Sequence, residues 1–340
     1  MIIARGRFPL WLAVACALLG LLVLWSFGVG RFPVATHDVW LALWSAIAGH
    51  DSGVAANVQA VVLQVRAPRV AAALAVGAAL AAAGASYQGL FRNALVSPDI
   101  LGVAAGCALG AATAILLALP GVAIQALAFA GGMLAVGIVV AVASWVRGRD
   151  ALLTLILSGV VVGSLFSAGI ALAEYLADPY NQLPAITFWL LGSFTAVTPR
   201  DLGPMLAALV VGLTPLLLLR WRIDVLALSE DEARSLGLRV GTLRIVVIAC
   251  ATLVTAASVA IAGTIGWIGL VVPHAARMLA GAAFSRVLPL SMVLGAAFML
   301  AVDTLCRTAF ATEVPPGVVT AFVGTPAFVV LMAIALRRGA

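Results

Sequence analysis

The segment Arg220–Arg244 reads RWRIDVLALSEDEARSLGLRVGTLR and interrupts a chain that otherwise consists of long apolar runs. It carries nine charged residues, whereas the whole chain of 340 has only 19 basic and 13 acidic ones. Hydrophobic residues make up 64% of the chain, and its mean hydropathy is +1.19. Only helices satisfy their own backbone polar groups in hydrocarbon, and each crossing needs about 20 apolar residues. The composition therefore predicts an all-α, polytopic membrane helix bundle, in which this segment is the part that works in water.

The charged segment contains signals for a short, rigid helix pair held at the membrane surface. Ser229 and Glu232 form a capping-box pattern, and Glu230 and Asp231 complement the positive end of a helix that starts there. Gly237 can adopt the left-handed conformation that ends a helix after about two turns. The alternative is a solvated loop that merely joins two spans. The strong caps and the lack of flexible Gly/Ser sequence favour a docking element instead.

The residue composition excludes several classes of function. Some required residues are absent from the chain, and others lie too far apart in the sequence to form a recognisable motif. All 19 basic residues are arginine, so the chain cannot supply the lysine of a nucleotide-binding P-loop or of Schiff-base chemistry. The four cysteines are isolated in apolar runs and the three histidines lie far apart, so no catalytic, metal or cofactor site is predicted. The net charge of +6 is spread over loops beside the apolar runs, which favours a role in topology over nucleic-acid binding.

Ten apolar runs predict ten membrane crossings. They cover residues 9–29, 68–90, 100–119, 122–146, 151–173, 201–220, 243–263, 265–281, 287–306 and 316–336. The first is long enough to be a retained helix and not a cleaved signal, the second has apolar sequence before it that could lengthen it, and 265–281 is short for a span. With the N-terminus in the cytoplasm, fourteen arginines fall on the cytoplasmic side and five on the other. This bias predicts that both termini and residues 220–244 are cytoplasmic.

Two further features shape the expected bundle. Runs rich in Gly and Ala, such as VGAALAAAGAS (76–86), predict close approach between helix backbones. On the outer side, the segment 174–195 is a polar turn followed by an amphipathic piece with Phe188 and Trp189, which predicts an interfacial helix. We therefore expect one transmembrane domain over residues 1–340, with no soluble domain.

Four stretches carry a resemblance to a known family. They are VRAPRVAAALAVGAALAAAGASYQGLFRNALVSPDILGVAAG (65–106), LALSEDEARSLGL (226–238), GTIGWIGLVVPHAARML (263–279) and VDTLCRTAFATEVPPGVVTAFVGTPAF (302–328). Together they resemble the FecCD-type permease subunits of ATP-driven (ABC) importers for ferric siderophores, haem and vitamin B12. The similarity covers nearly the whole chain in the same order.

The resemblance implies a bundle of ten helices per subunit, a homodimer, two cytoplasmic ATP-binding subunits that hold ATP and Mg, and a periplasmic binding protein. It implies a multi-pass protein of the bacterial inner membrane that is not itself an enzyme. By resemblance, the residues that couple to the ATPase are Ser229, Glu230, Asp231, Glu232, Ala233, Arg234, Ser235, Leu236, Gly237 and Leu238. Those that line the pathway would be Leu165, Phe166 and Ser167.

The five arginines expected on the outer side are Arg31, Arg66, Arg69, Arg200 and Arg307. Arg66, Arg69 and Arg307 match family arginines that are similar in position to those pairing with glutamates of the binding protein, a role that suits the planar guanidinium fork. The alternative is that they anchor helix ends at the membrane interface. Asp303, one helical turn before Arg307, is a partner for it within the chain.

The expected substrate is a metal chelate, and ferric siderophore is favoured. The sequence Asn93-Ala94-Leu95-Val96 departs from the NPLA that many members have, so haem, cobalamin and molybdate stay open as alternatives. A different class is an ion-coupled secondary transporter that uses Glu174, Asp303 or Glu313. All three acids are expected near the outer interface and not at mid-membrane, which counts against an ion site.

Overall fold

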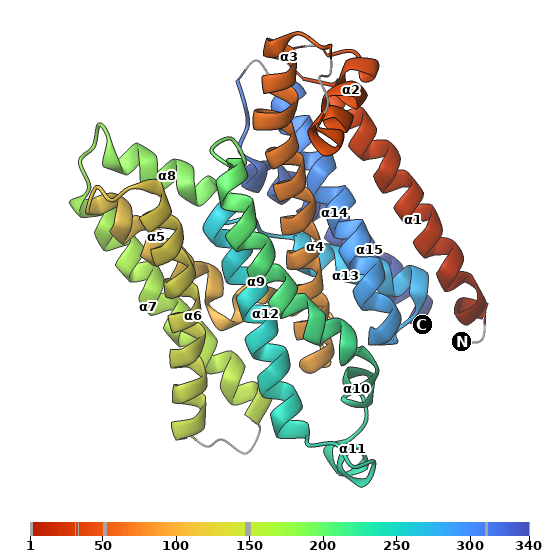
Figure 1. Cartoon of the computed structure of the whole chain (residues 1–340). Coiled ribbons are helices and arrows are strands. Elements are labelled where there is room, and N and C mark those ends of the chain that lie inside the picture. Colours follow the sequence, from red (N-terminus) through yellow and green to blue (C-terminus); the bar gives the residue numbers. More distant parts are fainter. Residues whose placement is uncertain are drawn as a thin grey trace.

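The computed structural model describes residues 3–30, 32, 34–49, 53–146, 151–309 and 312–339. Within these ranges the chain is helical and contains no strand. Figure 1 shows the longer helices arranged as a bundle around α4, with α10 and α11 projecting at one end and α2 and α3 at the other. The predicted all-α bundle is confirmed.

In chain order the helices are α1 (Ile3–Gly28), α2 (Thr36–Ala48), α3 (Ala56–Ala60), the π-helical η1 (Val61–Arg66), α4 (Ala67–Leu90), the 3-10 turn η2 (Pro98–Leu101), α5 (Val103–Leu116), α6 (Gly121–Val146), α7 (Ala151–Leu176), α8 (Gln182–Leu191), α9 (Pro199–Leu218), α10 (Arg220–Val225), α11 (Glu230–Ser235), α12 (Val240–Ala262), α13 (Ile268–Ala280), α14 (Phe284–Thr308) and α15 (Pro316–Gly339).

Each of the ten predicted crossings contains a helix, and eight helices among the described residues are long and apolar enough to span a membrane. The other two, α5 and α13, have 14 and 13 residues. At 1.5 Å per residue these helices are about 20 Å long, shorter than the roughly 30 Å hydrocarbon core. Each follows a turn, at 91–102 and 263–267, that the apolar pattern could not locate.

The second crossing is much longer than the predicted 68–90. Helices α3, η1 and α4 run on continuously as Ala56–Leu90. Pro68 lacks an N–H and cannot make the regular bond to the residue four before it. A π-helical turn precedes it, in which the Ala67 N–H reaches the Val62 carbonyl, five residues back. The helix is therefore extended beyond its apolar part, and this extension carries Arg66.

Close backbone packing around α4 depends on glycine. A Cβ on Gly77 would collide with the Gly295 carbonyl of α14, and a Cβ on Gly84 would collide with the backbone of Gly269 in α13. Membrane helices gain little from hydrophobic burial against one another, so such contacts rely on van der Waals packing at short range. The small-residue runs thus mark the contacts between α4 and its neighbours.

The two ends of the bundle differ in what covers them. The start of α1 and the end of α15 both lie in the lower half of Figure 1, toward the end that carries α10 and α11. At the other end, α8 packs on α5, where Gln182 Nε2 donates to the Leu116 carbonyl at 2.9 Å, while Phe188 is exposed. The helix expected within 174–195 is therefore present as α8. Helix α2 was not predicted, because its 13 residues are too few for a crossing.

Candidate functional site

The segment that holds α11 has the caps that the sequence predicts. The Glu232 backbone N–H donates to the Ser229 hydroxyl at 3.3 Å, and the Ser229 N–H donates to the Glu232 carboxylate at 2.9 Å. Gly237 has φ +81°, and its N–H donates to the Arg234 carbonyl at 2.9 Å. The capping box and the glycine stop are therefore confirmed, and α11 is a single capped helix of six residues.

Two long-range contacts fix this segment to the bundle. Arg92, just after α4, donates from Nε to the Leu226 carbonyl at 2.7 Å and from Nη2 to the Leu228 carbonyl. Asp224 of α10 accepts from the Ser285 backbone N–H, with both carboxylate oxygens 3.3–3.4 Å away. The chain around Ser229 is thus held against the ends of α4 and α14. It is a braced element and not a loose connection.

The acidic first turn of α11 lies at the surface, and one of its three carboxylates reaches the bundle. Glu230 bonds Arg234 at 2.7 Å and lies 3.4 Å from Arg244 of α12. Asp231 is exposed and makes no hydrogen bond or ion pair with any described residue. The hydrogen bonds from Ser229 lower the pKa of the Glu232 carboxyl from its ordinary value, because they stabilise the charged form. Glu232 therefore serves the cap, whereas Asp231 is free to meet a partner.

At the opposite end, a buried group of charges joins α4 to α14. Arg69 donates from Nε to both Asp303 oxygens at 2.9 and 3.1 Å and from Nη2 to Asp303 Oδ1 at 2.7 Å. Its Nη2 also bonds Glu313. Glu313 in turn accepts from the Thr195 hydroxyl at 3.1 Å. We name Arg66, Arg69, Asp303, Arg307 and Glu313 the arginine–carboxylate cluster.

The other two arginines of the cluster hold the end of α1. Arg66 donates to the Phe27 and Phe32 carbonyls. Arg307 donates from Nη1 to the Val29 carbonyl at 2.7 Å, and its Nε lies 3.7 Å from Asp303 Oδ2. The expected Asp303–Arg307 pair is present, but Asp303 binds Arg69 more closely. The cluster therefore joins α1, α4 and α14.

These contacts bear on the three arginines predicted to dock the binding protein. Arg66 and Arg69 are 6% and 8% exposed, and the Arg307 side chain is 12% exposed. All three guanidinium groups already have partners within the chain, which is also what an anchoring role requires. Docking stays a prediction for them. Of the other outer arginines, Arg200 is exposed at the start of α9, and Arg31 lies outside the described residues.

The three residues predicted to line the pathway point in different directions on α7. Leu165 is 70% exposed, whereas Phe166 is 8% exposed and lies in the core. Ser167 is exposed, and its hydroxyl donates to the Gly163 carbonyl at 2.9 Å. Consecutive helical residues are about 100° apart, so they cannot share one face. Their role in a pathway stays a prediction.

Sequence reasoning missed two contributors to these sites. Arg92 was counted only among the arginines that set topology, because its partners are backbone carbonyls that leave no signal in the sequence. Glu313 was weighed as an ion site, and its pairing with Arg69 depends on a separation of 244 residues. A usable signal did exist, since a buried carboxylate such as Asp303 requires a cation and few arginines are available at that end.

Comparison with known proteins places nearly the whole chain in one group. A model of the FecCD transport family matches residues 18–334. The molybdate import system permease protein of Haemophilus influenzae is 39% identical over 92% of this chain and 92% of its own length. A Helicobacter pylori protein named for iron chelatin transport, also a permease, is 36% identical over 94% of this chain and 96% of its own length.

A solved structure agrees with these sequence matches. It is an ABC transporter assigned to the metal-chelate type and captured in an inward-facing conformation. It is 36% identical to this chain with a TM-score of 0.85, and the match covers 96% of this chain and 99% of that one. The chain is thus a multi-pass permease subunit whose ATPase is a separate protein, and it belongs to the FecCD transport family of ABC importers.

Proposed function

We propose that this permease translocates a metal chelate, with a ferric siderophore as the favoured substrate. It would work as a homodimer with two ATP-binding subunits at the α11 end, which we place in the cytoplasm, and a periplasmic binding protein at the other end. The observation that carries the proposal is α11, because a capped and braced helix with an exposed acidic turn suits a rigid lever for a partner protein. ATP-driven closure of that partner would move α11, and rigid-body helix shifts would then open the bundle to each side in turn.

The substrate part of the proposal is supported by the iron chelatin relative and by the metal-chelate type of the solved transporter. Molybdate is the second candidate, because the Haemophilus influenzae relative is a molybdate permease with 39% identity. Haem and cobalamin are the remaining alternatives within the family. An ion-coupled mechanism at Asp303 or Glu313 loses support from the structure, since both carboxylates are already paired with Arg69.

Uptake into proteoliposomes tests the proposal directly. The permease, its ATPase and its binding protein are reconstituted together, and ATP-dependent uptake is compared for ferric siderophores, haem, cobalamin and molybdate. Selective uptake of a ferric chelate is expected. Selective uptake of molybdate would reject the substrate but keep the mechanism. Transport that persists without the ATPase and collapses with the ion gradient would reject the mechanism itself.

Asp231→Arg tests the proposed ATPase contact without disturbing the cap. Asp231 has no partner among the described residues, so the substitution changes the surface charge of α11 and leaves the Ser229–Glu232 bonds in place. We expect weaker co-purification of the ATPase or ATP hydrolysis that is no longer coupled to uptake. Arg200→Glu, a charge reversal at an exposed residue at the other end of the bundle, is the control. Normal coupled transport in the Asp231 variant would show that α11 is not part of the interface with the ATPase.

Docking of the binding protein is tested with Arg66→Gln, Arg69→Gln and Arg307→Gln, each measured for both thermal stability and binding-protein affinity. If these arginines dock the partner, affinity falls in a variant that retains its fold. A loss of stability with unchanged affinity in the folded fraction would leave them only the anchoring role.

A further inference from the structure

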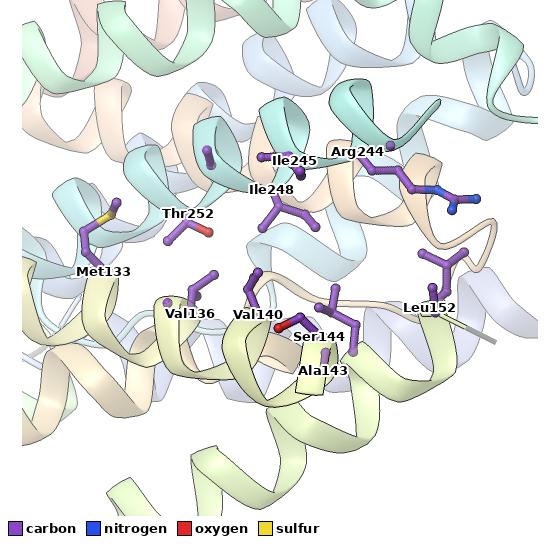
Figure 2. A pocket seen from close by; sticks show the side chains of 15 residues that line it. Met133, Val136, Val140, Ala143, Ser144, Leu152, Arg244, Ile245, Ile248 and Thr252 are labelled. Atoms are coloured by element: carbon purple, nitrogen blue, oxygen red, sulfur yellow. The ribbon is translucent and has the colours of Figure 1, made fainter. Parts of the chain in front are cut away.

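A crevice lies between α6, α7 and α12, with a volume of about 610 Å³ (Figure 2). Met133 and Thr252 lie at one end of it, and Arg244 and Leu152 lie at the other. The face of α12 that lines the crevice runs from Gly241 to Thr252, which is about 16 Å of helix at 1.5 Å per residue. This is close to half the roughly 30 Å hydrocarbon core, or one leaflet.

The crevice is built to hold an apolar molecule. Apart from Arg244, the described residues of its lining include only two polar side chains, Ser144 and Thr252. The Ser144 hydroxyl donates to the Ala141 carbonyl at 2.7 Å, and the Thr252 hydroxyl is 2.9 Å from the Tyr87 hydroxyl. Buried water needs two to four polar partners, which these satisfied groups do not offer. Leaving the space empty would forfeit the dispersion contacts of the lining.

Arg244 gives the crevice one charged end. Its Nη2 lies 3.4 Å from Glu230, which makes a shorter bond of 2.7 Å with Arg234. Its other donors have no hydrogen-bond partner among the described residues. A guanidinium fork matches the two free oxygens of a phosphodiester. If Arg244 turned to such a group, Glu230 would keep Arg234.

We propose that an anionic phospholipid occupies this crevice, with an acyl chain along α6 and α12 and its phosphate on Arg244. The apolar lining, the length of one leaflet and Arg244, the one cation among the described lining residues, all match such a molecule. Since lipid tails are already in an apolar medium, headgroup charge decides which lipid binds. The site therefore selects anionic over zwitterionic headgroups, whatever substrate the permease carries.

Native mass spectrometry of the purified full-length chain tests this, in micelles that contain equal amounts of phosphatidylglycerol and phosphatidylcholine with identical acyl chains. Wild type should retain phosphatidylglycerol preferentially. Arg244→Gln should lower that retention roughly fivefold, the equivalent of about 1 kcal/mol for one arginine near a membrane surface. Arg239→Gln is the matched control, because Arg239 is exposed at the same end but does not line the crevice.

A second variant tests the acyl chain itself. An added Cβ at Gly137 of α6 meets nothing within 4 Å, so Gly137→Phe fills the crevice without a clash at the backbone. It should remove one bound lipid of either headgroup and leave Arg244 intact. Gly20→Phe is the control on α1, where the Cβ position is also open.

Three results would overturn the proposal. The first is equal retention of phosphatidylglycerol in the Arg244 and Arg239 variants or in the two glycine variants. The second is displacement of the lipid by inorganic phosphate, which would assign Arg244 to a soluble anion. The third is a change in the number of chains per complex in Gly137→Phe with lipid retention unchanged, since a second copy of the chain would then cover the crevice. If Arg244→Gln is not recovered in folded form, Gly137→Phe decides alone.

Discussion

At the α11 end of the bundle, charged residues are more exposed and pair over short distances along the chain, as Glu230 does with Arg234 four residues later. In the arginine–carboxylate cluster they are buried, and Arg69 is 234 residues from Asp303. Exposed pairs contribute about 0–1 kcal/mol, because water already solvates both charges. Buried pairs are costly to break, because the remaining charge has lost its water.

The difference implies two kinds of task. Charges in the cluster have partners within the chain and hold α1, α4 and α14 together. Charges on α11 are left facing outward, where a partner protein could meet them. The same residue types are therefore buried and paired at one end and mostly exposed at the other, and matched substitutions at the two ends can test whether their roles differ.

The largest effect is expected from Asp303→Ala. The substitution leaves Arg69 and Arg307 without their buried carboxylate, and breaking such a pair costs about 3–5 kcal/mol. Thermal or chemical unfolding in detergent should show the loss. Asp231→Ala on α11 is the matched control and should stay within about 0.5 kcal/mol of wild type. If the two substitutions lower the free energy of unfolding equally, the charges at the two ends do not differ in their contribution to stability.

Arg92→Ala should have an intermediate and local effect. Arg92 donates two hydrogen bonds to carbonyls just before Ser229, and charge-assisted bonds contribute about 1.5–3 kcal/mol each when well shielded. Because Arg92 is exposed, we expect about 1–2 kcal/mol in total. Hydrogen exchange should become faster over residues 226–238 while the cluster keeps its protection. Unchanged exchange there would show that Arg92 does not brace the segment.

Ser229→Ala should loosen α11 by about 1 kcal/mol, the usual cost of losing an N-cap side chain. Ser229→Asp should preserve most of the protection, since Asp is an equally good N-cap. Amide exchange of residues 230–235 measures the change, and the global unfolding midpoint should stay near wild type. A large fall in that midpoint would mean that α11 supports the bundle and is not a separate surface element.

The smallest expected effect is the pH dependence of the cap. Hydrogen bonds from Ser229 lower the pKa of Glu232 in the folded state, so Glu232 stabilises α11 above the ordinary glutamate pKa and loses this effect as pH falls through the folded value. Carbon NMR of the labelled Glu232 carboxyl should show that the group titrates below the ordinary glutamate pKa. In Ser229→Ala the pKa should rise back toward it. If Glu232 titrates identically in wild type and in Ser229→Ala, the hydrogen bonds from Ser229 do not lower its pKa.

The sequence by itself determined the fold class, the approximate places of ten apolar helices, the caps of α11 and the family. These features are local or compositional: a capping box needs residues three positions apart, and a crossing needs one apolar run. The family could also be identified from the sequence, because the four stretches that resemble it follow the same order along the chain.

Only the tertiary structure decided the partners of the charged side chains and the lengths of the helices α5 and α13. No local pattern pairs Arg69 with Asp303, which is 234 residues away, and helix packing brings the two side chains together. The Arg92 brace, the π-helical turn before Pro68 and the crevice ending at Arg244 likewise depend on how separate helices meet. Residue type fixes how many hydrogen bonds a guanidinium can donate, but only the packing of distant segments determines which acceptors lie within its reach.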